Sequence, residues 1–320
     1  MDNFIVEELP ELEVGGQLQL KQTGERRDIE LKIVSAGNIV VNSNQHPVVP
    51  QPQQLLSFGA PPKSITLLKS LKPPSYPVSV CQQKGVTYLG MYNGTVSRID
   101  GNYKLHNPFI STPRTVESIS FHENKLYILS HSEPRTVNVY DLSGQLITTW
   151  QHPFHEWFSS MLTVTAGDVV IADPHNKRLI IYSLTGTTLH NVNCHLLSNA
   201  QVLLCTGHGD DVIIANSETN KVFRFNITTE NVRLTFTHPD PTQGLVCYRD
   251  YILVAARNSI SIYTLSYATG EKVSKMIDDG ISTDSCCNRI YSLSVTGQTL
   301  VVPHQSGVAG KLLFYKLSEK

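Results

Sequence analysis

The segment from His152 to Trp157, HPFHEW, brings together residue types that bind metal ions in hydrolases and lyases. Two histidines and a glutamate suit zinc when they follow the order H-E-x-x-H on a helix. The order here differs, and Pro153 favours a turn after a strand, so we interpret His152 and His155 as surface histidines. The chain also has no G-x-S-x-G motif, Walker loop or Cys–His pairing. We therefore predict no catalytic residue, no metal site, no cofactor and no enzymatic activity.

Basic side chains in polar segments between apolar runs are the second group of candidates, because they attract carboxylates and phosphates. The candidate ligand-binding residues are Arg114, Arg135, His175, Lys177, Arg178, Lys221, Arg257 and His304. A protein or peptide is the expected ligand. RNA is the alternative, because several basic groups on one face can neutralise phosphates. Acidic residues in the same segments, such as Glu133 and Glu218, dilute this charge.

Three of these polar residues also have a purely structural interpretation. Asp173, Asn176 and Arg178 follow one apolar run closely. Short polar side chains at such positions bond to the local backbone, and opposite charges pair. We expect the three side chains to brace their turn.

A short apolar run that recurs seven times must position these residues. Its starts are separated by 47, 40, 43, 43, 40 and 48 residues, a spacing that fits four short strands and their turns. A second strand follows most runs and carries an aromatic residue at a matching place, which we expect in the core. The runs begin at Ile39, Val86, Leu126, Val169, Val212, Ile252 and Leu300. The matching aromatics are Tyr140, Tyr182, Phe225, Tyr263 and Tyr315.

Four-stranded units with two apolar faces bury them best by stacking around an axis. The sequence therefore predicts an all-β fold, a single β-propeller over residues 15–320, after a flexible linker at 1–14. Seven blades are expected, and six are the alternative, because Pro47, Pro50 and Pro52 interrupt the first unit. The last unit lacks an outermost strand, so residues 17–22 (QLQLKQ) are expected to complete it.

The strands of each blade are called a to d from the axis outwards. The b–c and d–a turns then share one face of the ring, and the a–b and c–d turns share the other. All the basic candidates fall at the first of these faces, which we expect to bind the ligand.

The unit at 167–182, GDVVIADPHNKRLIIY, closely resembles an NHL repeat, whose pattern is a glycine, an apolar strand ending in Ala-Asp, and Asn-x-Arg before a second strand. VIIANSETNKVFRF is a weaker echo, and the Trp-Asp of WD40 units and the double glycine of kelch units are missing. Such propellers resemble the C-terminal domain of tripartite-motif (TRIM) ubiquitin ligases, which recruits substrate or RNA. The resemblance implies a substrate-recognition domain without ligase chemistry, and a parent chain that oligomerises through a coiled coil. A metal-dependent propeller hydrolase or lyase is the second alternative.

The composition limits the partner and the compartment. The chain has 320 residues with 26 basic and 27 acidic side chains, a net charge of −1 that argues against a basic nucleic-acid coat. No apolar run reaches eighteen residues, and the opening MDNFIVEELPELE has acids where a signal peptide has a basic flank. We therefore expect no membrane partner and a cytoplasmic location.

Overall fold

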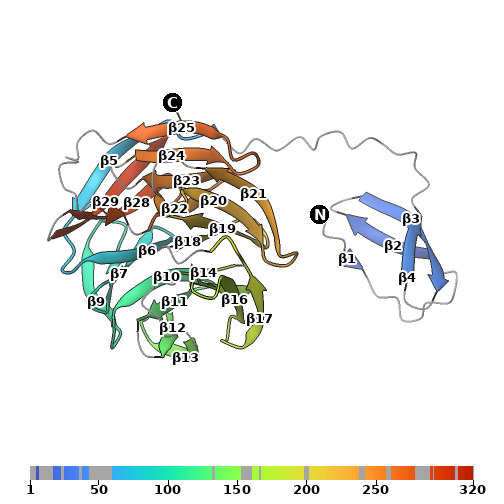
Figure 1. The fold of residues 1–320 in the computed structure, drawn as a ribbon, viewed down its shortest axis with the longest axis horizontal. Helices are drawn as coiled ribbons and strands as arrows, with labels where there is room; N and C mark the ends of the chain where they lie inside the picture. Colours follow the sequence, from blue (N-terminus) through green and yellow to red (C-terminus); the bar gives the residue numbers. More distant parts are fainter. Residues whose placement is uncertain are drawn as a thin grey trace. The chain divides into compact units, whose positions relative to one another are not determined.

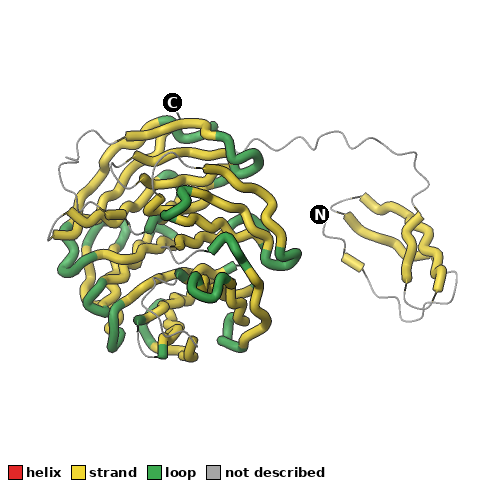
Figure 2. The backbone as a smooth tube through the Cα atoms, viewed as in Figure 1, coloured by secondary structure: helices red, strands yellow, loops and turns green. Residues whose placement is uncertain are grey.

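Six antiparallel sheets arranged around one axis form a β-propeller in the computed structural model (Figure 1). The structure describes residues 60–131, 134–152, 161–165, 167–197, 202–237, 242–256, 261–277, 289–290, 292–306 and 309–319, together with four strands before residue 43. Strands joined by turns account for these residues, and no helix is assigned among them (Figure 2). The all-β propeller is confirmed, with six blades, the alternative count.

Each blade runs through four strand positions in chain order. Blade 1 has β6 (Pro77–Gln83), β7 (Val86–Met91), β8 (Thr95–Ile99) and β9 (Leu105–Ser111). Blade 2 has β10 (Val116–His122), β11 (Lys125–Ser130), β12 (Arg135–Asp141) and β13 (Leu146–His152). Blade 3 has β14 (Leu162–Val164), β15 (Asp168–Asp173), β16 (Arg178–Ser183) and β17 (Thr188–Asn193).

The second half of the ring repeats this order. Blade 4 has β18 (Val202–Thr206), β19 (Asp211–Asn216), β20 (Lys221–Asn226) and β21 (Asn231–Thr237). Blade 5 has β22 (Thr242–Tyr248), β23 (Tyr251–Ala256), β24 (Ser261–Ser266) and β25 (Lys272–Ile277). Blade 6 has β26 (Arg289–Ile290) and β27 (Ser294–Thr296) at the axis, then β28 (Thr299–Ser306), β29 (Ala309–Ser318) and β5 (Ser64–Leu71).

The ring closes on itself through its innermost strands. β6, β10, β14, β18, β22 and β27 contact one another in a complete circle. Apolar residues on both faces of each sheet then pack between neighbouring blades, which is why the strands b read as nearly continuous apolar runs. The expected core aromatics are confirmed as buried: Tyr140, Tyr182, Phe225, Tyr263 and Tyr315.

The strand that completes the last blade is β5, and the expectation for residues 17–22 is wrong. β29 pairs with β5 from Leu312 opposite Leu71 to Ser318 opposite Ser64. Residues 17–22 instead form β2, which pairs with β1 (Ile5–Val6) and β3 (Glu25–Ser35). The physical reason is connection length, because β5 leads into β6 through a short turn and must therefore lie beside the neighbouring blade.

The expected first blade is likewise not part of the ring. The run at Ile39 lies in β4 (Asn38–Asn42), at the edge of the sheet β1-β2-β3-β4. This sheet belongs to a separate compact unit, residues 1–57, whereas the propeller falls in residues 58–320. The proline segment at 47–52 and most of the expected linker at 1–14 lie outside the described residues.

A glycine in the c–d turn of blade 3 packs directly on an aromatic ring of the preceding blade. A Cβ at Gly186 would stand 2.4 Å from Cδ2 of Trp150, on the outer strand of blade 2, and the glycine has a φ of +94°. Gly270 repeats this close approach, with its Cβ position 2.7 Å from Cδ1 of Phe236, and Gly144 contacts Phe109 less tightly, at 3.2 Å from its carbonyl oxygen. A glycine in the c–d turn therefore lets the turn contact the outer strand of the preceding blade.

Replacing Gly186 with alanine should lower the free energy of unfolding by about 3 kcal/mol, of which roughly 1 is the left-handed backbone and the rest overpacking. Gly85→Ala is the matched control, because Gly85 has a φ of +78° but nothing within 4 Å of its Cβ position. The control should lose about 1 kcal/mol. Urea unfolding measures both, and equal losses would contradict the role given to Trp150.

Candidate functional site

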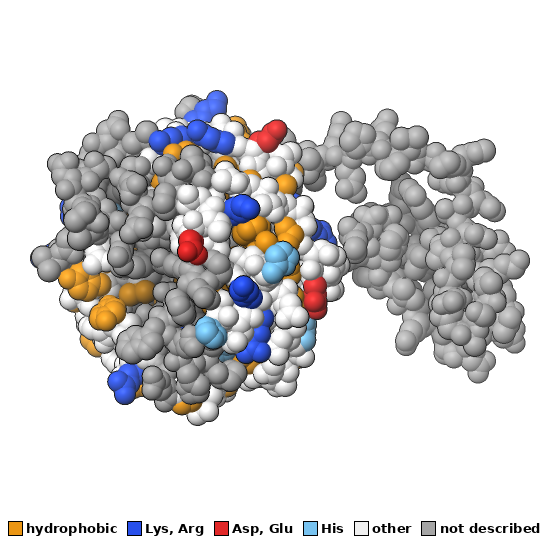
Figure 3. Space-filling view, viewed as in Figure 1, with side chains coloured by type: hydrophobic (Ala, Val, Ile, Leu, Met, Phe, Trp, Pro, Cys, Tyr) orange, Lys and Arg blue, Asp and Glu red, His pale blue; other side chains and the backbone are white. Residues whose placement is uncertain are grey.

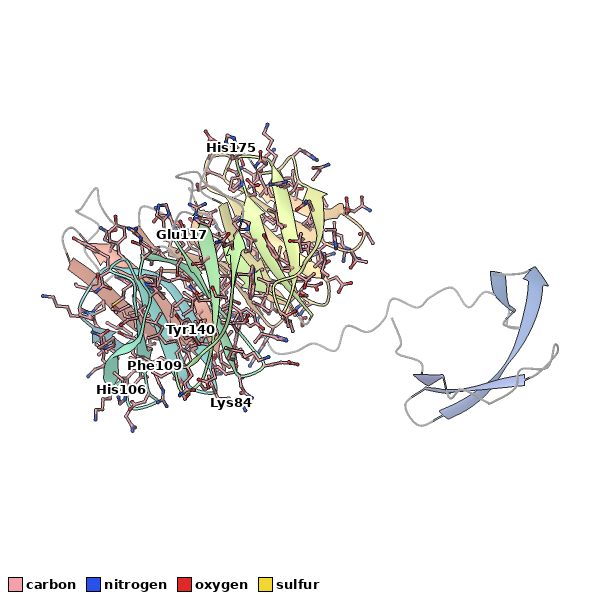
Figure 4. The ribbon with its side chains drawn as sticks, turned by 90° about the horizontal axis from the view of Figure 1, so that it is seen from below. Lys84, His106, Phe109, Glu117, Tyr140 and His175 are labelled. Carbon is pink, nitrogen blue, oxygen red and sulfur yellow. The ribbon has the colours of Figure 1, made fainter. Side chains whose placement is uncertain are left out.

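The basic residues expected to bind ligand do lie at the b–c/d–a face. Figure 4 places Glu117 and His175 toward this face and Lys84 and His106 toward the opposite one. Arg114 is in the d–a turn of blade 1, and His304 is in β28. The b–c turn of blade 3 contains His175 and Lys177. The first residue of strand c is Arg135 in blade 2, Arg178 in blade 3 and Lys221 in blade 4. Arg257 lies outside the described residues.

Exposure divides this group into exposed and buried residues, with Arg178 half-buried between them. Arg114, His175, Lys177 and Lys221 are exposed. Arg135 is 1% exposed and His304 is 2% exposed, so neither presents its polar end to a ligand at the surface. Burial, together with nearby Lys311, lowers the pKa of His304, which favours the neutral form of its imidazole.

Arg135 forms the centre of a buried polar cluster in blade 2. Its Nη2 donates to Oε1 of Glu117 over 2.9 Å, and Nδ1 of His131 lies 2.8 Å from the same oxygen. The other oxygen of Glu117, Oε2, is buried and has no hydrogen-bond partner among the described residues. Burial raises the pKa of Glu117, although Arg135 and His131 act against this rise. The ion pair holds the start of β10 against the start of β12.

The cluster continues into blade 3 through His152, which is buried rather than at the surface as expected. It is the last residue of β13, and its Nδ1 lies 2.7 Å from the hydroxyl of Tyr182 in β16. Burial raises the pKa of Tyr182 to about 12. The strand alternation that partly buries Trp150 also places His152 on the inner side, a signal in the sequence that could have identified this position. His155 lies outside the described residues.

Protons should bind more readily to His152 in the unfolded chain than in the folded one. Burial lowers its pKa from 6.5 to about 4, with Arg135 and Arg178 adding to the effect and Asp173 opposing it. The free energy of unfolding should therefore fall as the pH decreases through this window, by an amount on the order of 3 kcal/mol.

Urea unfolding of the wild type and of His152→Gln across that pH range measures the effect. The variant cannot titrate at this position, so its stability should fall less. Glu117, whose raised pKa acts in the opposite direction, is present in both chains and cancels in the difference. Parallel pH profiles would show that His152 does not carry the dependence.

The turn of blade 3 is braced as expected. Asp173 is fully buried, and its Oδ1 accepts the backbone N–H of Asn176 over 3.1 Å. Its Oδ2 accepts the Asn176 amide over 2.9 Å and Nε of Arg178 over 2.8 Å. These three residues support the turn, and the bonds leave the neighbouring Lys177 and His175 exposed on it.

The inner strands of the ring enclose a cavity of about 320 Å³. Inner strands of five blades line it, and none of the described lining residues is acidic or basic. Its serines join neighbouring blades: Oγ of Ser79 accepts the N–H of Ile119 over 3.0 Å, and Oγ of Ser118 donates to the carbonyl of Leu162 over 3.1 Å. These hydroxyls therefore act as structural links between inner strands.

Among the described residues, no group of three or more His, Cys, Asp or Glu side chains could hold a metal ion. A search of that same part of the chain finds no helix long and apolar enough to cross a membrane. A scan against models of known protein families finds no match.

Proposed function

We propose that the propeller is a recognition domain that binds a protein or peptide partner through its b–c/d–a face. Propellers commonly serve as rigid scaffolds for protein binding, because their turns can vary without disturbing the packed sheets. The observation that carries the proposal is the exposure of Arg114, Lys177, Lys221 and Tyr92 on this one face. Tyrosine and arginine are enriched among residues that dominate binding energy at protein interfaces.

The finer assignment is a substrate-recruiting part of a TRIM-like ubiquitin ligase in the cytoplasm. The likeness of residues 167–182 to an NHL repeat supports it. The structure adds that Asp173, Asn176 and Arg178 of this segment act together in the turn. The proposal assigns no catalytic step to the ring itself.

A photo-crosslinking side chain placed at Lys221 tests the proposal in the full chain inside cells. Lys221 is exposed at the b–c/d–a face, whereas Lys104, the control position, is exposed in the c–d turn of blade 1 on the opposite face. Discrete protein adducts that survive nuclease treatment are expected from position 221 and not from position 104.

Equal adducts from both faces would contradict the choice of face. Adducts that disappear with nuclease and weaken steeply as salt rises would instead identify RNA as the ligand, because phosphate binding releases counterions.

A further inference from the structure

The turns where blade 6 meets blade 1 form one fixed surface. The backbone N–H of Tyr92, in the b–c turn of blade 1, donates to the carbonyl of Tyr76 over 2.9 Å. In the d–a turn, the N–H and hydroxyl of Thr112 both donate to the carbonyl of Gly94 over 2.8 Å. A Cβ at Gly94 would lie 2.6 Å from the carbonyl oxygen of Arg114, so the approach is close. Three connections, 72–76, 92–94 and 112–115, are therefore held together.

The side chains on this surface are cationic and aromatic. Tyr92 is 63% exposed, the most exposed of the large hydrophobic side chains in the described residues. Arg114 and Lys72 are exposed in the flanking d–a turns. Figure 3 looks onto this face and shows hydrophobic side chains gathered over β6, β7 and β9. We name Lys72, Tyr76, Tyr92, Arg114 and Lys311 the blade 6–1 patch.

Two cations of the patch flank the end of one strand ladder. β29 pairs with β5 so that Leu312 is opposite Leu71, the last residue of β5, and Lys311 precedes Leu312 in the chain as Lys72 follows Leu71. Both lysines are exposed. Two exposed lysines at the same end of a ladder both attract an anion that binds there, because each adds its own Coulomb attraction.

Among the described residues, no carboxylate in the segments that form the patch balances this charge. The segments KPPSY at 72–76, YNG at 92–94, TPRT at 112–115 and HQSGVAGK at 304–311 contain no Asp or Glu. The carboxylate that follows in the chain, Glu117, already accepts from Arg135. Lys72, Arg114 and Lys311 form no ion pair with a carboxylate of the described residues. Asp278 and Asp279 lie outside the described residues.

We infer that the blade 6–1 patch binds an acidic peptide segment of the partner, with carboxylates beside Lys72, Lys311 and Arg114 and an apolar side chain against Tyr92. The inference rests on the proposed recognition function and names its ligand chemistry. Complementary charge steers the encounter, and the exposed ring supplies apolar contact area at its centre.

Fluorescence anisotropy with the full chain tests this, at about 0.15 M salt so that only close charges contribute. The probe is a short labelled peptide of alternating glutamate and leucine, compared with its glutamine counterpart and with oligouridine of equal length. The glutamate peptide should bind at least about tenfold more tightly than both comparators.

Charge reversal separates the patch from general electrostatics. Lys72→Glu/Lys311→Glu should weaken peptide binding about tenfold or more, and Tyr92→Ala should weaken it to a similar degree. The control Lys84→Glu/Lys104→Glu makes the same change in net charge on the opposite face, where both lysines are exposed, and should change affinity less than about twofold.

Equal weakening by both double variants, or tighter binding of oligouridine than of the peptide, would overturn the inference. Protein adducts at position 221 report on the proposed function separately. If these adducts persist while the peptide fails to bind, the acidic-peptide site is wrong and the recognition function stands.

Discussion

A chain that lacks residues 1–71 is expected to lose the cooperative unfolding transition of the propeller, whereas a chain that lacks only residues 1–57 should keep it. The longer deletion removes β5, whose ladder with β29 runs from Leu71 to Ser64. It also exposes β29 as an open edge and uncovers apolar neighbours of Ile65 and Leu71 in two inter-blade cores. The loss should be on the order of 5 kcal/mol, a large share of the stability of a typical domain. Thermal unfolding followed by circular dichroism measures it.

Complementation provides the control for this deletion. A synthetic peptide of residues 60–71 should restore the transition of the shorter chain, because β5 is held by hydrogen bonds and packing alone. The segment before β5 also binds to the ring, since the carbonyl of Pro62 accepts a 2.6 Å hydrogen bond from Ser274 in blade 5. If deletion of residues 1–57 were as damaging as deletion of residues 1–71, the ring would depend on the first unit and this account of closure would fail.

The fold was largely predictable because the residues that repeat along the sequence are the apolar residues of the core. Six of the seven apolar runs are strands b of six blades, and their positions follow from burial on both faces of each sheet. Apolar alternation did not predict which segment supplies the outermost strand of the last blade, because residues 17–22 and 64–71 are both plausible strands. The length of the connection to blade 1 did distinguish the two segments. SITLLKSL precedes the inner strand of blade 1 by only a short turn, as outer strands do elsewhere in the ring.

The site was predictable as a face but not residue by residue. Arg135, Arg178 and Lys221 each begin a strand c, so the repeat makes them equivalent. Their surroundings differ because the neighbouring polar residue differs: Glu117 pairs with Arg135 and Asp173 with Arg178, whereas Asn216 lies opposite Lys221. A single sequence shows the three basic residues but does not show which polar side chain lies beside each of them in the folded protein.

That difference predicts a large effect at one of these equivalent positions. Arg135→Ala should lower the free energy of unfolding by about 3–5 kcal/mol, because it leaves the carboxylate of Glu117 buried without its cation. Glu117 has a side chain only 11% exposed, so water cannot replace the guanidinium fully. Lys221→Ala is the matched control, an exposed cation at the start of strand c in blade 4, and should change stability by less than about 0.5 kcal/mol. Urea unfolding at neutral pH compares the two.

The pH dependence of the Arg135→Ala loss identifies its cause. Burial already raises the pKa of Glu117 in the wild type, and removing Arg135 takes away the strongest influence that lowers it. The carboxyl group of the variant should therefore take up a proton as the pH falls, which removes the buried charge and part of the destabilisation. Adding Glu117→Gln to Arg135→Ala should likewise recover part of the lost stability at neutral pH. A loss that stays the same in acid and in the double variant would mean that Arg135 acts by packing of its aliphatic stem, not by its charge.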